Sequence, residues 1–286
     1  MATLTELVRD ELAIPVDPRV AAMAAALAAR YPGSARAVLF YGSCLRMSEL
    51  DGLMLDFYLI VSDYGDAFPK RWMALANRLI PPNVFPFQHD GLIAKYAVLS
   101  EGDFDRLNAP ETRNVSVWAR FAQPSRLVWA VDDTARDRAV AAVSRAAPTL
   151  LAAAGRIPGE DLLDWWRRAF SLTYSVELRA ERTGRAQSVV DAEPDRYLRF
   201  GAAAAVAIPA QAKSGGWPRR RIEGKLLSIA RLAKASLTYA GGIDYLAWKI
   251  NRHAGTKIEI KPWQRRWPLV AALTLVPRLM KSGAIR

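Results

Sequence analysis

The segment from Leu39 to Val61, LFYGSCLRMSELDGLMLDFYLIV, decides the fold. Its two apolar runs belong to the stretches 35–43 and 54–63, and short apolar runs bounded by turn or polar residues predict strands. The pair Gly42-Ser43 ends the first run, and one carboxylate, Asp56, lies at the start of the second. We therefore predict two strands joined by a polar connection, with a Gly-Ser turn after the first strand.

Further elements are predicted around this segment from their periodicity and their end signals. They are helices at 17–33 and 70–80 and strands at 91–100 and 124–132. From residue 134 onward the apolar periodicity is mainly helical. We expect an α+β fold with three parts: a mixed sheet with flanking helices in residues 1–133, a mainly helical domain in 134–260, and a basic amphipathic tail in 261–286.

Charge is distributed unevenly along the chain. The protein has 286 residues, a hydrophobic fraction of 51% and a formal net charge of +12. From Lys213 to Arg286 there are 16 lysines and arginines against 3 acids, whereas the preceding residues are close to neutral. A basic segment of this kind predicts an anionic partner, either nucleic acid or anionic lipid.

Other features indicate the compartment. Cys44 is the only cysteine, so no internal disulfide is possible and a reducing compartment fits. The first residues lack a long apolar run, so we do not expect a signal peptide. No stretch reaches the roughly 20 apolar residues of a membrane span, since Pro268 and Pro277 interrupt the nearest candidate. We expect a cytoplasmic protein, peripheral on the inner face of a membrane.

The Gly-Ser turn and Asp56 together indicate phosphate chemistry. Backbone N–H groups at such a turn can bind phosphate oxygens, and a nearby carboxylate can hold a Mg²⁺ ion that bridges them. The order of turn, polar gap and acid resembles the signature of polymerase-β-type nucleotidyltransferases. That resemblance implies metal-assisted attack on the α-phosphate of a nucleotide, with release of pyrophosphate. The usual pattern has a second acid two residues later, where this chain has Tyr58.

Four segments, in order, resemble the mitochondrial-type phosphatidate cytidylyltransferases, which are peripheral CDP-diacylglycerol synthases. The segments are FYGSCL, LMLDFYLIVSD, LIAKYAVLS and WARFAQPSRLVW. The resemblance covers about 39–131 and, more faintly, 237–255. A single acid in the LDF context is also met in that family, so Tyr58 is less unusual there. The chain departs from the family at FQHDG, where a His-Tyr pair is expected, and at Cys44, where a third small residue usually follows.

This resemblance implies a role for each matching residue. Gly42-Ser43 would bind the phosphates of CTP, and Tyr41 would shape the turn. Asp56 would be the principal Mg²⁺ ligand, and Lys95 would neutralise phosphate charge during catalysis. Asp63 would complete the metal site, although strand parity places it on the face opposite Asp56, so a bend has to bring it round.

Each residue also has a structural interpretation. Gly42-Ser43 fits an ordinary turn, Asp56 a cap at a strand edge, Asp63 a turn residue and Lys95 a lysine facing the edge of the sheet. Arg46 either steers the triphosphate or is solvated on a helix face. Other side chains could act as ligands, but such residues are more often surface or isolated groups: Glu49, Asp51, His89, Arg120, Arg126 and His253.

The C-terminal segment has the composition of an interfacial helix. Residues 261–283 combine Trp263, Trp267 and several cations with a short apolar body. Tryptophans and cations around a segment too short to span a bilayer favour the headgroup layer. The alternative is a helix that packs its apolar face on the protein. Nucleic acid is a less favoured partner, because the aromatic-basic interleaving of an RNA-binding surface is missing.

We therefore expect a nucleotidyltransferase that uses CTP and Mg²⁺. The resemblance implies that it transfers CMP to phosphatidate, or a related lipid phosphate, at an anionic membrane surface. Two alternatives stay open. One is a nucleotidyltransferase that acts on RNA or a small soluble acceptor, and the other is a catalytically inactive protein that binds nucleotide or lipid.

Overall fold

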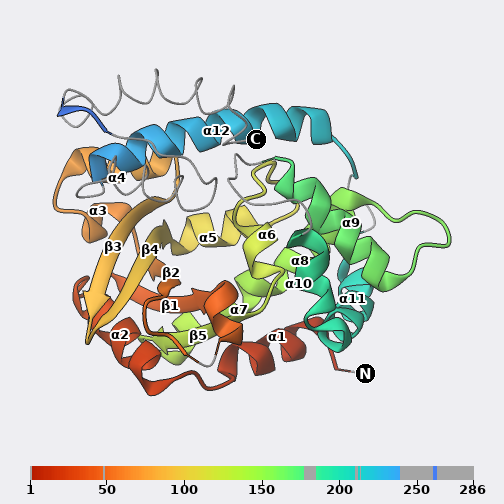
Figure 1. Ribbon diagram of the computed structural model, residues 1–286, viewed down its shortest axis with the longest axis horizontal. Coiled ribbons are helices and arrows are strands. Elements are labelled where there is room, and N and C mark those ends of the chain that lie inside the picture. Colours follow the sequence, from red (N-terminus) through yellow and green to blue (C-terminus); the bar gives the residue numbers. More distant parts are fainter. Residues whose placement is uncertain are drawn as a thin grey trace.

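The described part of the chain folds around one β-sheet with many helices. The computed structural model describes residues 2–47, 49–176, 185–209, 212, 214–238 and 260–262. Figure 1 shows the sheet on one side of the molecule and a group of helices on the other. Helix α12 (Trp217–Thr238) runs along the top of the view from those helices toward the sheet. Almost all of the predicted tail, 261–286, lies outside the described residues.

The sheet has five strands in the order β3-β4-β2-β1-β5. Strands β2 and β4 pair in parallel and the other neighbours are antiparallel, so the sheet is mixed. The four strands expected from the sequence are confirmed, and with them the α+β class with a mixed sheet. The strands are β1 (Ala35–Tyr41), β2 (Met54–Val61), β3 (Asn83–His89), β4 (Leu92–Ser100) and β5 (Ser125–Ala130).

Strand β3 is an element that the sequence pattern did not predict. Pro86 lies inside it, and a proline within an apolar run argues against a strand because it has no N–H to donate. The structure shows that Pro86 is tolerated because of the place of β3 in the sheet. β3 is at the edge of the sheet and pairs only with β4 within the described residues, so one side of its backbone needs no partner strand.

Helices cover both faces of the sheet. On one face α2 (Pro18–Ala29), α3 (Tyr64–Ala67) and α4 (Arg71–Leu79) pack with alternate residues of β2, such as Phe57 and Leu59. On the other face the remaining helices pack with Tyr58 and Ile60. They include α1 (Leu4–Ala13), α5 (Glu101–Asn108), α6 (Trp118–Phe121), α7 (Asp133–Ser144), α8 (Ala146–Ala154), α9 (Leu162–Tyr174), α10 (Arg185–Asp191) and α11 (Pro194–Ala207).

Local signals mark the start of one helix that the sequence predicted and of one that it missed. Asp17 caps α2 by accepting a hydrogen bond of 2.8 Å from the backbone N–H of Arg19. Helix α1 begins with a reciprocal capping box between Thr3 and Glu6.

Among the described helices, none by itself is both long enough and apolar enough to cross a membrane.

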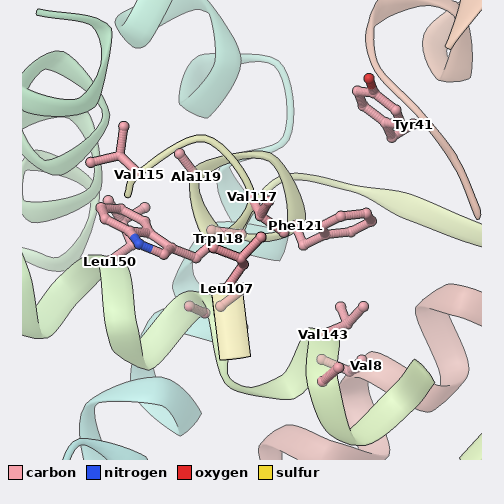
Figure 2. Packing of buried hydrophobic residues seen from close by; sticks show 14 of the residues in the cluster. Val8, Tyr41, Leu107, Val115, Val117, Trp118, Ala119, Phe121, Val143 and Leu150 are labelled. Atoms are coloured by element: carbon pink, nitrogen blue, oxygen red, sulfur yellow. The ribbon is translucent and has the colours of Figure 1, made fainter. Parts of the chain in front are cut away.

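A buried aromatic residue joins the sheet to the helical part. Trp118 of α6 is fully buried, and Figure 2 shows it between Leu107 of α5 and Leu150 of α8. The same cluster includes residues from β1, β2 and α11. Residues on both sides of the predicted boundary at 133 therefore share one hydrophobic core, while the division into two domains stays a prediction.

A buried ion pair connects segments that are 185 residues apart in the sequence. Arg196 of α11 donates to both carboxylate oxygens of Glu11 in α1, at 2.9 Å in the longer contact, and to the backbone oxygen of Ala122. Its guanidinium also lies 4.2 Å from the ring centroid of Phe200. Both partners are almost completely buried, so neither charge can regain its hydration if the other is removed.

We predict that Arg196→Leu lowers the free energy of unfolding by about 3–5 kcal/mol, because Glu11 is left buried without its partner. Urea denaturation would measure this. Arg167→Leu is the matched control, since Arg167 of α9 forms exposed pairs with Asp164 and Asp191 at 2.7 Å. We expect it to cost less than about 1 kcal/mol. Equal losses for the two variants would contradict the structural role of the buried pair.

Helix α12 is attached to the loop between α4 and β3 by two cations. Arg231 donates to the backbone oxygen of Pro81 at 2.8 Å, and Lys234 donates to that of Pro82 at 2.9 Å and to that of Ile80. Lys234 is buried, and burial, followed by the charge of Arg231, lowers its pKa to about 7.

This pKa predicts a pH-dependent contribution to stability. An unfolded lysine titrates near 10.5, so between about pH 7 and 10.5 the unfolded chain binds a proton that the folded chain has lost. Stability from this group therefore rises with pH, by up to about 1.4 kcal/mol per unit, and is flat below pH 7. Urea denaturation of Lys234→Met should lack this rise. Parallel pH profiles for the variant and the wild type would refute the prediction.

Candidate active site at the end of strand β1

Three strands bring their polar residues to one row across the sheet. Tyr41, the last residue of β1, pairs with Asp56 of β2, and Asp56 pairs with Lys95 of β4. Side chains alternate between the two faces of a strand. Because Tyr58 and Ala97 belong to the cluster beneath α6, Asp56 and Lys95 point to that same face. The sequence-predicted residues Tyr41, Asp56 and Lys95 are thus brought together.

Gly42 closes this row from the end of β1. Its φ of 95° lies in the left-handed region, which disfavours a side chain, and it precedes the short 3₁₀ helix η1 (Ser43–Arg46). A Cβ atom at this position would lie only 3.2 Å from Oδ2 of Asp56. Glycine is therefore needed both for the backbone conformation and for the approach of the turn to the carboxylate. Ser43, at the start of η1, is exposed.

The carboxylate and the ammonium group form the charged centre of the site. Nζ of Lys95 lies 3.0 Å from Oδ1 of Asp56, and both side chains keep about a quarter of their surface exposed, at 27% and 21%. Oδ1 of Asp56 is buried and accepts no hydrogen bond from the residues that the structure describes. The contact with the ammonium group of Lys95 therefore offsets the cost of burying this oxygen. The partly exposed ammonium group is suited to contact anionic phosphate oxygens, and the partly exposed carboxylate is suited to contact a divalent ion.

Cys44 has a structural role beside this centre. Its thiol is buried and donates to the backbone oxygen of Met54 at 3.5 Å. Burial, and then the negative charge of Asp56, raise the pKa of Cys44. The thiol therefore stays protonated near neutral pH, which fits a packing role rather than that of a nucleophile.

Tyr58 shows why this strand carries one acid. Its ring is buried and packs against those of Tyr41 and Phe121, with its centroid 5.2 Å from each. A carboxylate at this position would be enclosed by aromatic rings, which is costly without a charged partner. The hydrophobic core therefore begins two residues after Asp56, at the position where the general nucleotidyltransferase pattern has its second acid.

Asp63 does not join the site. It lies at the opposite end of β2, and seven residues of extended chain separate it from Asp56 by roughly 20 Å. There it caps α3 by accepting a 2.6 Å hydrogen bond from the N–H of Gly65, and it pairs with Arg78 at 2.8 Å. These contacts lower the pKa of its carboxyl group, the Gly65 hydrogen bond most strongly. The bend that would bring Asp63 to Asp56 is absent, because β2 pairs with β4 in unbroken register from Met54 to Val61.

The loop after η1 supplies no alternative cluster of ligands. Asp51 is exposed and pairs with Arg19 at 3.1 Å, and Glu49 is also exposed. No group of three or more His, Cys, Asp or Glu residues that could hold a metal ion exists among the described residues. The backbone of Arg46 belongs to η1, whereas its side chain lies outside the described atoms. Among the residues that the structure describes, Asp56 is the carboxylate next to the Gly42 turn and Lys95.

The structure adds one cation that sequence reasoning had weighed as a surface charge. Cζ of Arg120 in α6 lies 5.6 Å from the ring centroid of Tyr41, so a second positive group borders the row. No local pattern could have indicated this. The position of Arg120 depends on α6, a helix of four residues whose place next to β1 is set by the packing of Trp118 and Phe121.

Taken together, the site holds one carboxylate, two cations and a glycine turn that approaches the carboxylate. Comparison of the chain with protein-family models and with curated proteins found no match. Chemically, the arrangement would suit a chain of phosphates between the turn and the cations, and Asp56 would be the residue that holds a divalent cation, which would supply further positive charge.

We predict that Gly42→Ala and Gly52→Ala each destabilise the fold by about 1–2 kcal/mol, because both glycines have positive φ, 95° and 72°. Only Gly42→Ala should reduce the thermal stabilisation produced by CTP with Mg²⁺. Its methyl group meets Asp56, whereas nothing lies within 4 Å of a Cβ at Gly52. Differential scanning fluorimetry would measure both effects. An undiminished CTP response in Gly42→Ala would show that the turn is not part of the site.

Proposed function

We propose that the protein is a Mg²⁺-dependent nucleotidyltransferase that transfers CMP from CTP to phosphatidate or a related lipid phosphate, with release of pyrophosphate. The observation that carries this proposal is the convergence of Gly42, Asp56 and Lys95 at one end of the sheet. Phosphoryl-type transfer needs position and charge rather than a protein nucleophile, and these groups supply both.

Each residue has a defined part in the proposed reaction. An oxygen of the acceptor phosphate attacks the α-phosphorus of CTP, the bond from that phosphorus to the β-phosphate oxygen breaks, and pyrophosphate leaves. A Mg²⁺ ion on Asp56 would neutralise charge on the phosphates. Lys95 contacts Asp56 at 3.0 Å and exchanges this contact for a phosphate oxygen when the nucleotide binds. The N–H groups at Gly42-Ser43 and the guanidinium of Arg120 bind the remaining phosphate charge.

The choice of a lipid acceptor rests on the sequence. It follows from the resemblance over 39–131 and from the excess of basic residues after Lys213. A catalytic domain without a spanning helix among its described residues needs another way to meet a lipid, and a basic interfacial tail is one. The proposed protein is cytoplasmic and peripheral on an anionic membrane surface. Nucleotide transfer to RNA or to a small soluble acceptor is the alternative within the same chemistry.

A second candidate function is binding without catalysis. The observation in its favour is Tyr58, whose burial leaves Asp56 as the one carboxylate of this strand at the site. A protein of this kind would bind a nucleotide or a lipid phosphate and release no pyrophosphate. The two functions therefore differ in a single measurable product.

We predict that the protein converts labelled CTP and phosphatidate vesicles to labelled lipid in the presence of Mg²⁺, and that Asp56→Asn lowers this rate roughly a hundredfold or more. The amide keeps the shape of the side chain but removes the charge that holds the metal. Asp51→Asn is the matched control, because Asp51 is an exposed acid close in sequence that pairs with Arg19.

Three results would decide between the candidates. Labelled lipid from the wild type and the Asp51 variant, but not from Asp56→Asn, supports the transferase. Stabilisation by CTP without any pyrophosphate release supports the binding protein. Equal turnover in Asp56→Asn and wild type would remove Asp56 from the mechanism.

A further inference from the structure

Helix α4 exposes an apolar face that no described element covers. Trp72, Leu75 and Leu79 are 47%, 57% and 70% exposed, the last two among the more exposed large apolar side chains of the described chain. Their spacing of three and four residues places them on one side of the helix. We call these three residues the α4 stripe. The opposite side of the helix is held by the fold, since Ala74 and Asn77 are buried.

Basic side chains border the α4 stripe. Lys70, Arg71 and Arg78 are exposed on or next to the helix, and residues 70–79 contain no acid. Arg78 pairs with Asp63 at 2.8 Å, which leaves Lys70 and Arg71 at the N-terminal end beside Trp72. A surface that complements the stripe therefore has to offer apolar contact and negative charge together.

The helix is fixed to the body of the protein, so the stripe is a rigid surface. Nδ2 of Asn77 donates to the backbone oxygen of Val98 in β4 at 2.9 Å, and Nδ2 of Asn83 donates to that of Met73 at 3.1 Å. The residues that follow α4 are held by Arg231 and Lys234 of α12. These contacts orient the stripe outward, on the side of the sheet opposite Asp56.

We propose that the α4 stripe docks on an anionic lipid bilayer. Trp72 and the two leucines would enter the boundary between headgroups and acyl chains, and Lys70 and Arg71 would contact lipid phosphates. A helix of nine residues is too short to cross a bilayer but long enough to lie in its interface. The biological purpose of this contact rests on the proposed function, because it would keep the catalytic domain itself, and not only a tail, at the membrane surface, with the candidate site on the face of the sheet opposite the stripe.

Co-sedimentation of the full chain with vesicles tests this proposal without any catalytic step. The vesicles are phosphatidylcholine with and without phosphatidylserine, neither of which is the proposed substrate. We expect Leu75→Glu to lower the apparent affinity for phosphatidylserine vesicles at least about tenfold. The substitution removes an apolar side chain that would be buried in the bilayer and adds a negative charge that the anionic lipid repels. Val206→Glu is the matched control, since Val206 of α11 is 89% exposed and away from α4. It should sediment like the wild type.

A second variant separates the charge from the apolar contact. Arg71→Gln should weaken binding to phosphatidylserine vesicles and leave binding to phosphatidylcholine unchanged. Unchanged sedimentation of both α4 variants, with folding verified by circular dichroism, would overturn the proposal. So would a shift of the lipid-free protein from dimer to monomer in Leu75→Glu with unchanged vesicle binding, which would assign the stripe to a second copy of the chain. A protein that binds these vesicles through α4 but makes no labelled lipid would refute the proposed function alone.

Discussion

The register of β2 between its two neighbours is the constraint on which the site depends. Antiparallel pairing with β1 and parallel pairing with β4 place Tyr41, Asp56 and Lys95 in one row. A slip of one residue would turn Asp56 to the other face of the sheet and into an apolar cluster. The alternate residues of β2 fill separate clusters on the two faces, so the packing that builds the core also holds the row in place.

The same packing limits the chemistry available at the site. Within two residues β2 passes from partly exposed Asp56 to buried Tyr58, whose ring packs against two other aromatic rings. Only the first position can carry a charge at low cost. The glycine turn compensates in part for the missing second acid. Because Gly42 has no side chain, its backbone can approach the carboxylate of Asp56. The result is a compact centre that depends on one acid and its neighbouring cations.

Long-range contacts join helices α11 and α12 to distant parts of the chain. The Arg196–Glu11 pair fastens α11 to the N-terminal helix, and Arg231 and Lys234 fasten α12 to the loop before β3. The candidate site and the α4 stripe lie on opposite faces of the sheet. Loss of one surface by mutation therefore need not disturb the other, which makes the two proposals separable.

By itself the sequence determined the elements whose signals are local. Apolar runs marked four strands, Asp17 marked the start of α2, and the spacing between Gly42 and Asp56 predicted a site, whose two residues the structure places next to each other. Only the tertiary structure decided which residues share that site. It showed that Pro86 is tolerated at an edge strand, that Arg120 borders the row, and that Asp63 lies at the far end of β2. The physical reason is that these outcomes depend on strand order and on packing between distant segments, which no local pattern records.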